Sequence, residues 1–193
     1  MSSLALDRHG WLRQHPKVAH APSPNHDTRP QGTDPILLVV HNISLPPGQF
    51  GGTEVVDLFL NRLDYSSHPW LPRLRGLRVS AHFFVRRDGT VVQFVSSDQR
   101  AWHAGVSSFE GRQRCNDFSI GIELEGTDCT PYTEDQYRTL AELNSALRCR
   151  HALKAVRGHE HIAPGRKTDP GPSFDWGRFG QECGWFRRQM PPV

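Results

Sequence analysis

The fold is decided by the stretch Ile36-Leu37-Leu38-Val39-Val40-His41, whose first five residues form the longest apolar run of the chain. A run without polar alternation is typical of a strand that is buried on both faces of a sheet. Such strands lie in the middle of sheets that helices cover, so the stretch predicts an α/β domain. It also places a histidine, His41, at the end of a rigid element, where functional side chains are often held.

Further segments read as strands of the same sheet. Asp88-Gly89 separates two β-branched and aromatic runs, Arg78–Arg86 and Thr90–Val95, and this pattern predicts an antiparallel hairpin. Residues 118–125 alternate between apolar and polar side chains, which is the period of a half-buried strand. Residues 155–159 form another short run. Together with the central strand, these segments predict a mixed sheet.

The helices that would flank this sheet are marked by caps and periodicity. Residues 54–62 read as a short amphipathic helix. Thr133 and Gln136 make a capping box, and apolar residues at helical spacing continue that helix to about His151. Asp175 can cap a last helix that runs toward Phe186. The predicted fold class is α/β in the broad (α+β) sense, a mixed central β-sheet flanked by helices in a single domain.

The two ends of the chain differ from its middle. Residues 1–20 are polar with weak helical spacing, and residues 21–35 form a proline-rich loop. We therefore expect an N-terminal extension over residues 1–21, the folded domain over residues 22–183 and a C-terminal tail over residues 184–193.

Composition limits the classes of function. The net charge of +3, without any run of five basic residues, does not support nucleic-acid binding. No stretch of about 20 apolar residues could span a membrane, and the first residues lack the apolar core of a secretory signal. The 4 cysteines are widely spaced, which favours reduced thiols in a cytosol over a disulfide framework. We expect a cytoplasmic monomer that acts on a small molecule, with no nucleic-acid or membrane partner.

The chain is rich in histidine, with 11, and two of these residues end predicted strands. His41 and His159 lie at strand ends, and Asp169 follows in a loop rich in proline and glycine. Two imidazoles and a carboxylate suit Zn²⁺, and three protein ligands leave a fourth position for water. No local signature such as HExxH supports this set. His161 would face the same side as His159 in an extended chain and is a rival ligand.

Two charged side chains could carry the chemistry beside such a metal. Glu123 lies on the polar face of the alternating strand, where it is either a partly desolvated general base or a surface carboxylate on a wet face. Lys167 precedes Asp169 by two residues. It either stabilises an oxyanion next to the metal or forms an exposed ion pair of little energetic value.

Five stretches of the chain, in this order, resemble the N-acetylmuramoyl-L-alanine amidases, zinc enzymes whose fold is shared with phage-lysozyme amidases and peptidoglycan-recognition proteins. The stretches are LVVHNISLPPG (38–48), RVSAHF (78–83), RAWHAG (100–105), NDFSIGIELEG (116–126), and GH (158–159) continuing to KTDPGP (167–172). The resemblance covers about residues 22–179 and implies a zinc amidase domain there.

The resemblance also implies roles for individual residues. The zinc ligands of the family correspond to His41, His159 and Asp169, the same three residues that the positions in the chain suggest. The resemblance therefore favours His159 over His161 as the ligand. Its catalytic acid falls on Glu123 and its catalytic lysine on Lys167. The implied substrate contacts are Asn42, Arg78, Trp102, His103 and Arg114.

The resemblance is strongest to the branch of the family that works in cytoplasmic cell-wall recycling. It implies zinc-dependent hydrolysis of the amide between (1,6-anhydro-)N-acetylmuramic acid and L-alanine in muropeptides derived from peptidoglycan. One alternative is a recognition module of the same fold that binds muropeptides without cleaving them. A second is an exported amidase for intact cell-wall polymer, and a third is an unrelated zinc deacetylase or peptidase, which fits the ligands but not the motifs.

Overall fold

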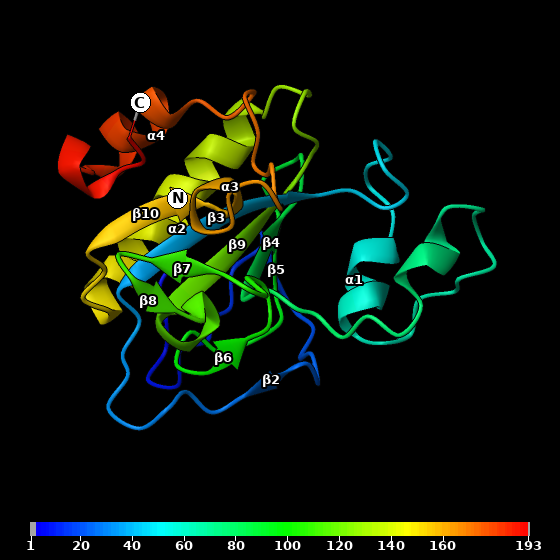
Figure 1. The fold of residues 1–193 in the computed structure, drawn as a ribbon, viewed down its shortest axis with the longest axis horizontal. Coiled ribbons are helices and arrows are strands. Elements are labelled where there is room, and N and C mark those ends of the chain that lie inside the picture. The colour runs from blue at the N-terminus through cyan, green and yellow to red at the C-terminus, as the bar shows by residue number, and fades with distance from the viewer. Residues whose placement is uncertain (1–2, 193) are drawn as a thin grey trace.

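The computed structural model of this chain describes residues 3–192 and is built around a six-stranded sheet (Figure 1). The strand order is β1-β5-β4-β9-β3-β10. The bounds are β1 (Val18–His20), β3 (Leu37–Ile43), β4 (Phe83–Val85), β5 (Val91–Gln93), β9 (Ser119–Glu125) and β10 (Ala155–Gly158). The strand predicted from the apolar run is β3, and it lies inside the sheet between β9 and β10.

Parallel and antiparallel pairs coexist in this sheet, so the predicted mixed sheet is confirmed. β3 runs parallel to both β9 and β10, and β9 runs parallel to β4. β4 and β5 form the predicted antiparallel hairpin, and β5 is joined on its other side by β1. The first hairpin strand is shorter than expected because the chain before β4 turns away, where the Ser80 N–H donates to the carbonyl of Trp102 at 3.1 Å.

The remaining elements are short strands and helices around the sheet. Two small two-stranded sheets pair β2 (His26–Asp27) with β6 (Arg100–Ala101) and β7 (Ser108–Phe109) with β8 (Arg112–Gln113). The helices are α1 (Glu54–Phe59), η1 (Leu71–Leu74), η2 (Cys115–Phe118), α2 (Glu134–Arg150), α3 (His159–Ile162), α4 (Trp176–Cys183) and η3 (Arg187–Gln189). The three predicted helices are present, although α1 and α4 end earlier than expected. No helix within residues 3–192 has the length and apolar character needed to cross a membrane.

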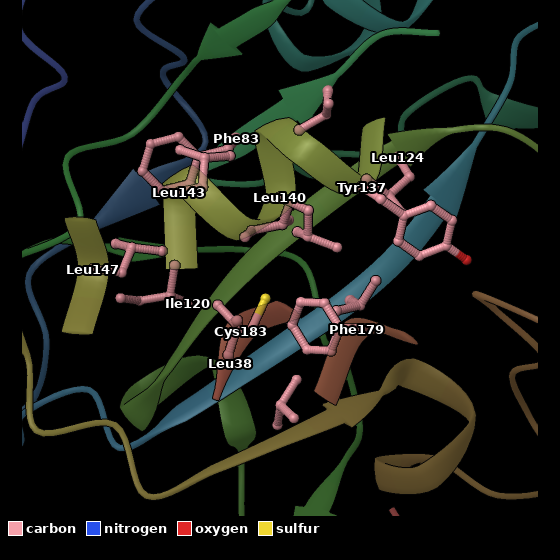
Figure 2. Close-up of a cluster of buried hydrophobic side chains, with 14 of the residues drawn as sticks. Leu38, Phe83, Ile120, Leu124, Tyr137, Leu140, Leu143, Leu147, Phe179 and Cys183 are labelled. Atoms are coloured by element: carbon pink, nitrogen blue, oxygen red, sulfur yellow. The ribbon is translucent and has the colours of Figure 1, made fainter. Parts of the chain in front are cut away.

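A large apolar cluster fills the space between one face of the sheet and helices α2 and α4 (Figure 2). Helix α2 contributes Leu140, Leu143 and Leu147, which pack with Leu38 of β3 and Ile120 of β9. Each buried side chain of this size stabilises the fold by about 1.5–3 kcal/mol. This layer packs against one face of the central strands. The side chains that form the site come from the opposite face.

The opposite face of the sheet is also covered, which corrects one expectation. All seven residues of β9 are buried, although its alternation predicts a strand that is wet on one face. The reason is that β9 lies between β3 and β4, and a second cluster that includes Phe118 and Ala104 packs on this face. The interpretation of Glu123 as an exposed carboxylate is therefore wrong.

Helices α1 and η1 belong to an arm with a core of its own, and Figure 1 shows α1 standing to one side of the sheet. Val55, Leu58 and Phe59 of α1 pack with Leu71 of η1 and with Phe84 of β4. The arm is thus anchored on the hairpin side of the sheet and forms a wall beside the ends of the central strands.

Both ends of the described chain pack against the domain that they were expected to flank. The weak helical spacing of residues 1–20 does not correspond to a helix within residues 3–20, and these residues supply β1. Leu12 is buried, and its N–H donates to Oε1 of buried Gln93 at 2.7 Å. At the other end, Trp185 is buried in the large cluster of Figure 2. Leu4 and Leu12 belong to the same cluster, because apolar residues too sparse to form a helical stripe can still fill gaps in a core.

Replacing Thr133 by Ala is expected to destabilise the fold by about 1 kcal/mol without changing the site. Thr133 caps α2 in a capping box, in which its hydroxyl accepts the N–H of Gln136 at 3.1 Å. The loss is measured as the free energy of unfolding in urea. Thr133→Ser keeps the hydroxyl and should retain most of that stability, and equal losses in the two variants would contradict the capping role.

Candidate active site

The site lies where three parallel strands end. In the register of β3 and β9, His41 lies directly beside Glu123, and β10 ends at Gly158, so that His159 follows at the same edge. Neighbouring strands lie about 4.8 Å apart, and paired residues of parallel strands share a face. Strand pairing therefore brings His41 close to Glu123, which is 82 positions away in the sequence, and to the end of β10, which His159 follows.

The predicted metal-ligand trio is assembled in one place. Nδ1 of His41 lies 3.0 Å from Nδ1 of His159 and 3.0 Å from Oδ2 of Asp169. Nδ1 of His159 lies 3.2 Å from the same oxygen. Four ligand atoms at about 2 Å from a tetrahedral Zn²⁺ lie about 3.3 Å from one another, which is close to this spacing. Within residues 3–192, this is the one group of His, Cys and acidic side chains found with such convergence.

The hydrogen bond behind His159 shows that this donor set fits a metal. Nε2 of His159 lies 3.0 Å from the carbonyl oxygen of Ala104. A carbonyl can only accept, so Nε2 carries the proton, and Nδ1 of a neutral His159 presents a bare lone pair toward His41 and Asp169. Two imidazole nitrogens and a carboxylate oxygen that converge in this way form a donor set that suits a metal cation.

The electrostatics of the trio keep its members in ligand form. Burial lowers the pKa of His41 to about 4, so its imidazole is neutral at neutral pH. Burial by itself would raise the pKa of Asp169, but the close contact of its carboxylate with the imidazoles of His159 and His41 holds it well below its usual range. Asp169 is therefore a carboxylate and His41 a neutral base, as metal binding requires.

The rival ligand, His161, is not part of the trio. Residues 159–162 form a helical turn, α3, instead of the extended chain that would have placed His159 and His161 on one side. Nδ1 of His161 accepts the N–H of Gly158 at 2.9 Å, and its ring packs on the edge of Trp176. His161 is not a ligand beside His159, because the backbone at residues 159–162 is helical and turns the two rings to different sides.

Glu123 is buried beside the trio, with 9% of its surface exposed, and its Oε2 has no hydrogen-bond partner among the described residues. Burial raises the pKa of its carboxyl group well above the ordinary value, and the negative charge of Asp169 raises it further, against an opposing effect of Lys167. A carboxyl group whose pKa is raised in this way keeps its proton to a higher pH than a free carboxyl group does.

Lys167 and Asp169 are carried by the loop that joins α3 to α4. Lys167 is exposed and lines the same cleft as Glu123. The alternative suggested by the sequence, an exposed ion pair between Lys167 and Asp169, is not found within residues 3–192. The loop is held in place at Pro170. The carbonyl of Pro170 accepts hydrogen bonds from Nδ2 of Asn42 at 3.1 Å and from the hydroxyl of Tyr132 at 2.8 Å. These bonds fix the carboxylate that precedes Pro170.

Close packing under this loop requires a glycine at the end of β10. A Cβ on Gly158 would lie 2.6 Å from Cδ of Pro170, which is shorter than such contacts allow. The glycine therefore lets the loop approach the strand closely enough for Asp169 to reach the two imidazoles.

His159, Asp169 and Glu123 line a cleft of about 740 Å³, a size typical of small-molecule sites. One wall carries the polar groups, and the other is the arm, which contributes Leu58, Phe59, Trp70, Leu74 and Leu77. This apolar wall was not predicted from the sequence, because the periodicity of residues 54–62 indicates a helix but not which part of the fold that helix faces.

Four of the five predicted substrate contacts line this cleft. They are Asn42, Arg78, Trp102 and His103, whereas Arg114 is not among the lining residues and lies 3.4 Å from Asp117. The side-chain amide of Asn42 is engaged by the protein, with Asp128 and Pro170. Arg166, which sequence reasoning missed, also lines the cleft and donates to the carbonyl of Ala104 at 3.0 Å.

Comparison with known proteins gives the class to which this fold and site belong. A family model described as N-acetylmuramoyl-L-alanine amidase (Amidase_2) matches residues 31–172. The 1,6-anhydro-N-acetylmuramyl-L-alanine amidase AmpD of Citrobacter freundii is 58% identical over 178 residues, which cover 91% of this chain and 93% of that protein. The chain belongs to the N-acetylmuramoyl-L-alanine amidase family.

Solved structures agree with this assignment. A crystal structure of a selenomethionine derivative of AmpD has a TM-score of 0.87 and 55% identity, and covers 92% of this chain and 98% of that one. The Escherichia coli amidase AmiD, solved with anhydro-N-acetylmuramic acid-L-Ala-D-gamma-Glu-L-Lys, has a TM-score of 0.55 and 27% identity, over 93% and 65% of the two chains. The fold and the amidase class expected from the sequence are confirmed.

Replacing Glu123 by Gln is expected to stabilise the chelator-treated protein at pH 7. The pKa of Glu123 is raised in the folded state, so the folded protein holds this proton more tightly than the unfolded chain does. Stability is therefore lost as the pH rises above the unfolded pKa of about 4.3, and an amide avoids that loss. An unpaired buried charge costs at least about 1–3 kcal/mol, and each kcal/mol shifts Tm by about 2–4 °C in a domain of this size.

The measurement is a thermal melt at several pH values in the presence of a chelator. The advantage of Glu123→Gln should shrink as the pH falls toward 4, and Glu142→Gln on α2 serves as the matched control with no such trend. A variant that melts below the wild type at pH 7 would show that the buried carboxylate is stabilised by a partner.

Proposed function

We propose that the chain is a zinc-dependent amidase that hydrolyses the bond between the lactyl group of 1,6-anhydro-N-acetylmuramic acid and the L-alanine of muropeptides, in the cytoplasmic recycling of the cell wall. The observation that carries the proposal is the convergence of His41, His159 and Asp169 beside the buried carboxyl of Glu123. The proposed substrate is supported by the 58% identity to a protein named as a 1,6-anhydro-N-acetylmuramyl-L-alanine amidase.

His41, His159 and Asp169 would hold the zinc ion through Nδ1, Nδ1 and a carboxylate oxygen. When bound, Zn²⁺ supplies Lewis acidity and lowers the pKa of a coordinated water toward about 7. The protein keeps all three ligands in their binding form by burial and by the hydrogen bond from His159 to the Ala104 carbonyl. Its three-ligand set leaves room for water and substrate, as catalytic zinc sites do.

Glu123 acts as the general base and then as the general acid. Its carboxylate takes a proton from the attacking water, and its raised pKa lets it carry that proton until the amine leaves. Burial supports this role, because no protein donor competes for Oε2 within the described chain. The side chain is held by a central strand, so it needs no rearrangement at the moment of reaction.

Lys167 stabilises the negative charge that develops on the carbonyl oxygen of the scissile amide. Its ammonium group is carried by the loop of Asp169 and lies at the rim of the same cleft. A cation placed where charge develops lowers the barrier more than it strengthens binding of the neutral amide.

The remaining walls of the cleft suit a muropeptide, which joins a compact sugar to an anionic peptide. Exposed Arg78 can pair with a carboxylate of the stem peptide, and half-buried Trp102 offers an aromatic face. The anhydro bond removes a hydroxyl from the sugar, and the apolar wall formed by the arm favours that less polar form. Arg114 remains a proposed substrate contact from outside the lined cleft, and the protein is proposed to act as a monomer.

The function is tested by mass spectrometry of the products formed from a synthetic anhydro-muropeptide. Wild-type protein with zinc should release the anhydro sugar and the free stem peptide, and a chelator should stop the reaction. Glu123→Gln should keep the metal and lose about 10²–10⁴-fold in turnover, the usual contribution of a general base. Binding of the muropeptide without products would instead identify a recognition module.

The ligand set is tested by metal analysis of single variants. His159→Ala should lose tightly bound zinc, because only two ligands remain. His161→Ala changes a ring that points at Trp176 and should keep full zinc content. The reverse pattern, zinc retained in His159→Ala and lost in His161→Ala, would overturn the assignment.

A further inference from the structure

His103 lines the cleft, but its ring is almost enclosed between His41 and the sheet. It follows β6 in the chain, and only 8% of its surface is exposed. Its ring occupies the space above Gly121 of β9, where a Cβ would lie 2.5 Å from the ring atoms. A glycine inside a strand often marks a close approach of another group. Here it makes room for an imidazole against the sheet, next to His41.

His103 joins His41 to a buried serine in a line of hydrogen bonds. Nδ1 of His103 lies 2.9 Å from Nε2 of His41, and Nε2 of His103 lies 3.1 Å from Oγ of Ser119. The two imidazole rings meet edge to face, with 5.0 Å between centroids. Both nitrogens of His103 are therefore used by the protein, and neither is left for a substrate.

The protons along this line can be arranged in two directions. In one, His41 Nε2–H donates to His103, and His103 Nε2–H donates to Ser119. In the other, Ser119 donates to His103, and His103 donates to His41, which leaves the His41 proton on Nδ1. A hydroxyl can donate or accept, so Ser119 tolerates both. Only the first direction gives His41 a bare Nδ1 facing His159 and Asp169.

The same segment of chain also orients the second imidazole. The Ala104 carbonyl accepts from His159, and the N–H groups of His103 and Ala104 both donate to Oδ1 of Asn116, at 3.1 and 2.8 Å. One short, doubly anchored segment thus lies behind both proposed imidazole ligands. Its position is fixed independently of either ring.

We propose that His103 is a positioning residue, which accepts the Nε2 proton of His41 and so holds the Nδ1 lone pair of His41 on the metal position. The inference rests on the proposed metal site and replaces the earlier expectation that His103 contacts substrate. Hydrogen-bond partners of metal-binding histidines typically contribute 10–100-fold to metal affinity, or about 1.4–2.7 kcal/mol.

The test compares the zinc affinity of two variants of nearly equal shape, by competition with a chromophoric chelator. His103→Leu removes the acceptor and should weaken zinc binding by about 10–100-fold. His103→Asn places an amide oxygen near the position of Nδ1 and should recover most of that loss. His151→Leu, which removes a half-buried histidine outside the cleft, should leave the affinity unchanged.

Two results would overturn the proposal in this experiment. Equal losses in His103→Leu and His103→Asn would mean that the ring only fills space. Unchanged zinc affinity with a raised KM for the muropeptide would return His103 to the substrate contacts. Because zinc affinity is measured without substrate, failure of the proposed reaction would leave this test intact.

The wild-type protein gives a second readout that needs no variant. In the zinc-loaded protein with ¹⁵N-labelled histidine, long-range proton–nitrogen spectra should show the proton of His103 on Nε2 and Nδ1 bare. A proton on Nδ1 of His103 in that state would overturn the proposal, even if both variants failed to fold.

Discussion

The parallel pairing of β3 with β9 and β10 is the constraint on which the site depends. It sets His41 beside Glu123 and ends β10 one residue before His159, so three groups from distant parts of the chain meet at one sheet edge. Ligand sites in sheets of this kind commonly form at the carboxyl ends of parallel strands. The register cannot slip by one residue, because that would turn His41 and Glu123 into the apolar core.

Burial of this edge creates both the reactivity and a cost to stability. The same covering layers raise the pKa of Glu123 and lower that of His41, which keeps the His41 imidazole neutral. A buried carboxyl group without a partner destabilises the fold, and the large apolar cluster under the opposite face of the sheet offsets that cost. Gly121 and Gly158 have no side chain to pack. Their lack of a Cβ leaves space for the ring of His103 and for the loop at Pro170, respectively.

Much of the fold could be predicted because its signals are local. The apolar run of β3, the Asp88-Gly89 turn and the Thr133 cap each determine an element within a few residues. The predictions that were wrong depend on which elements pack against a segment, and local sequence patterns do not contain that information. The alternation of β9 indicates one wet face, but its neighbours in the sheet cover both, and the HEH spacing at residues 159–161 means different things in a strand and in a helical turn.

The sequence by itself determined the residue types and motifs of a muramoyl amidase, since two strand-ending histidines, a carboxylate and a strand glutamate can be read directly. Only the tertiary structure decided which atoms face one another. It assigned Nδ1 of both histidines to the meeting point, separated His161 from it and placed His103 behind His41. The physical reason is that a tautomer or a ring orientation is set by hydrogen bonds from residues far away in the chain, such as Ala104 and Ser119, and these partners exist only once the sheet has formed.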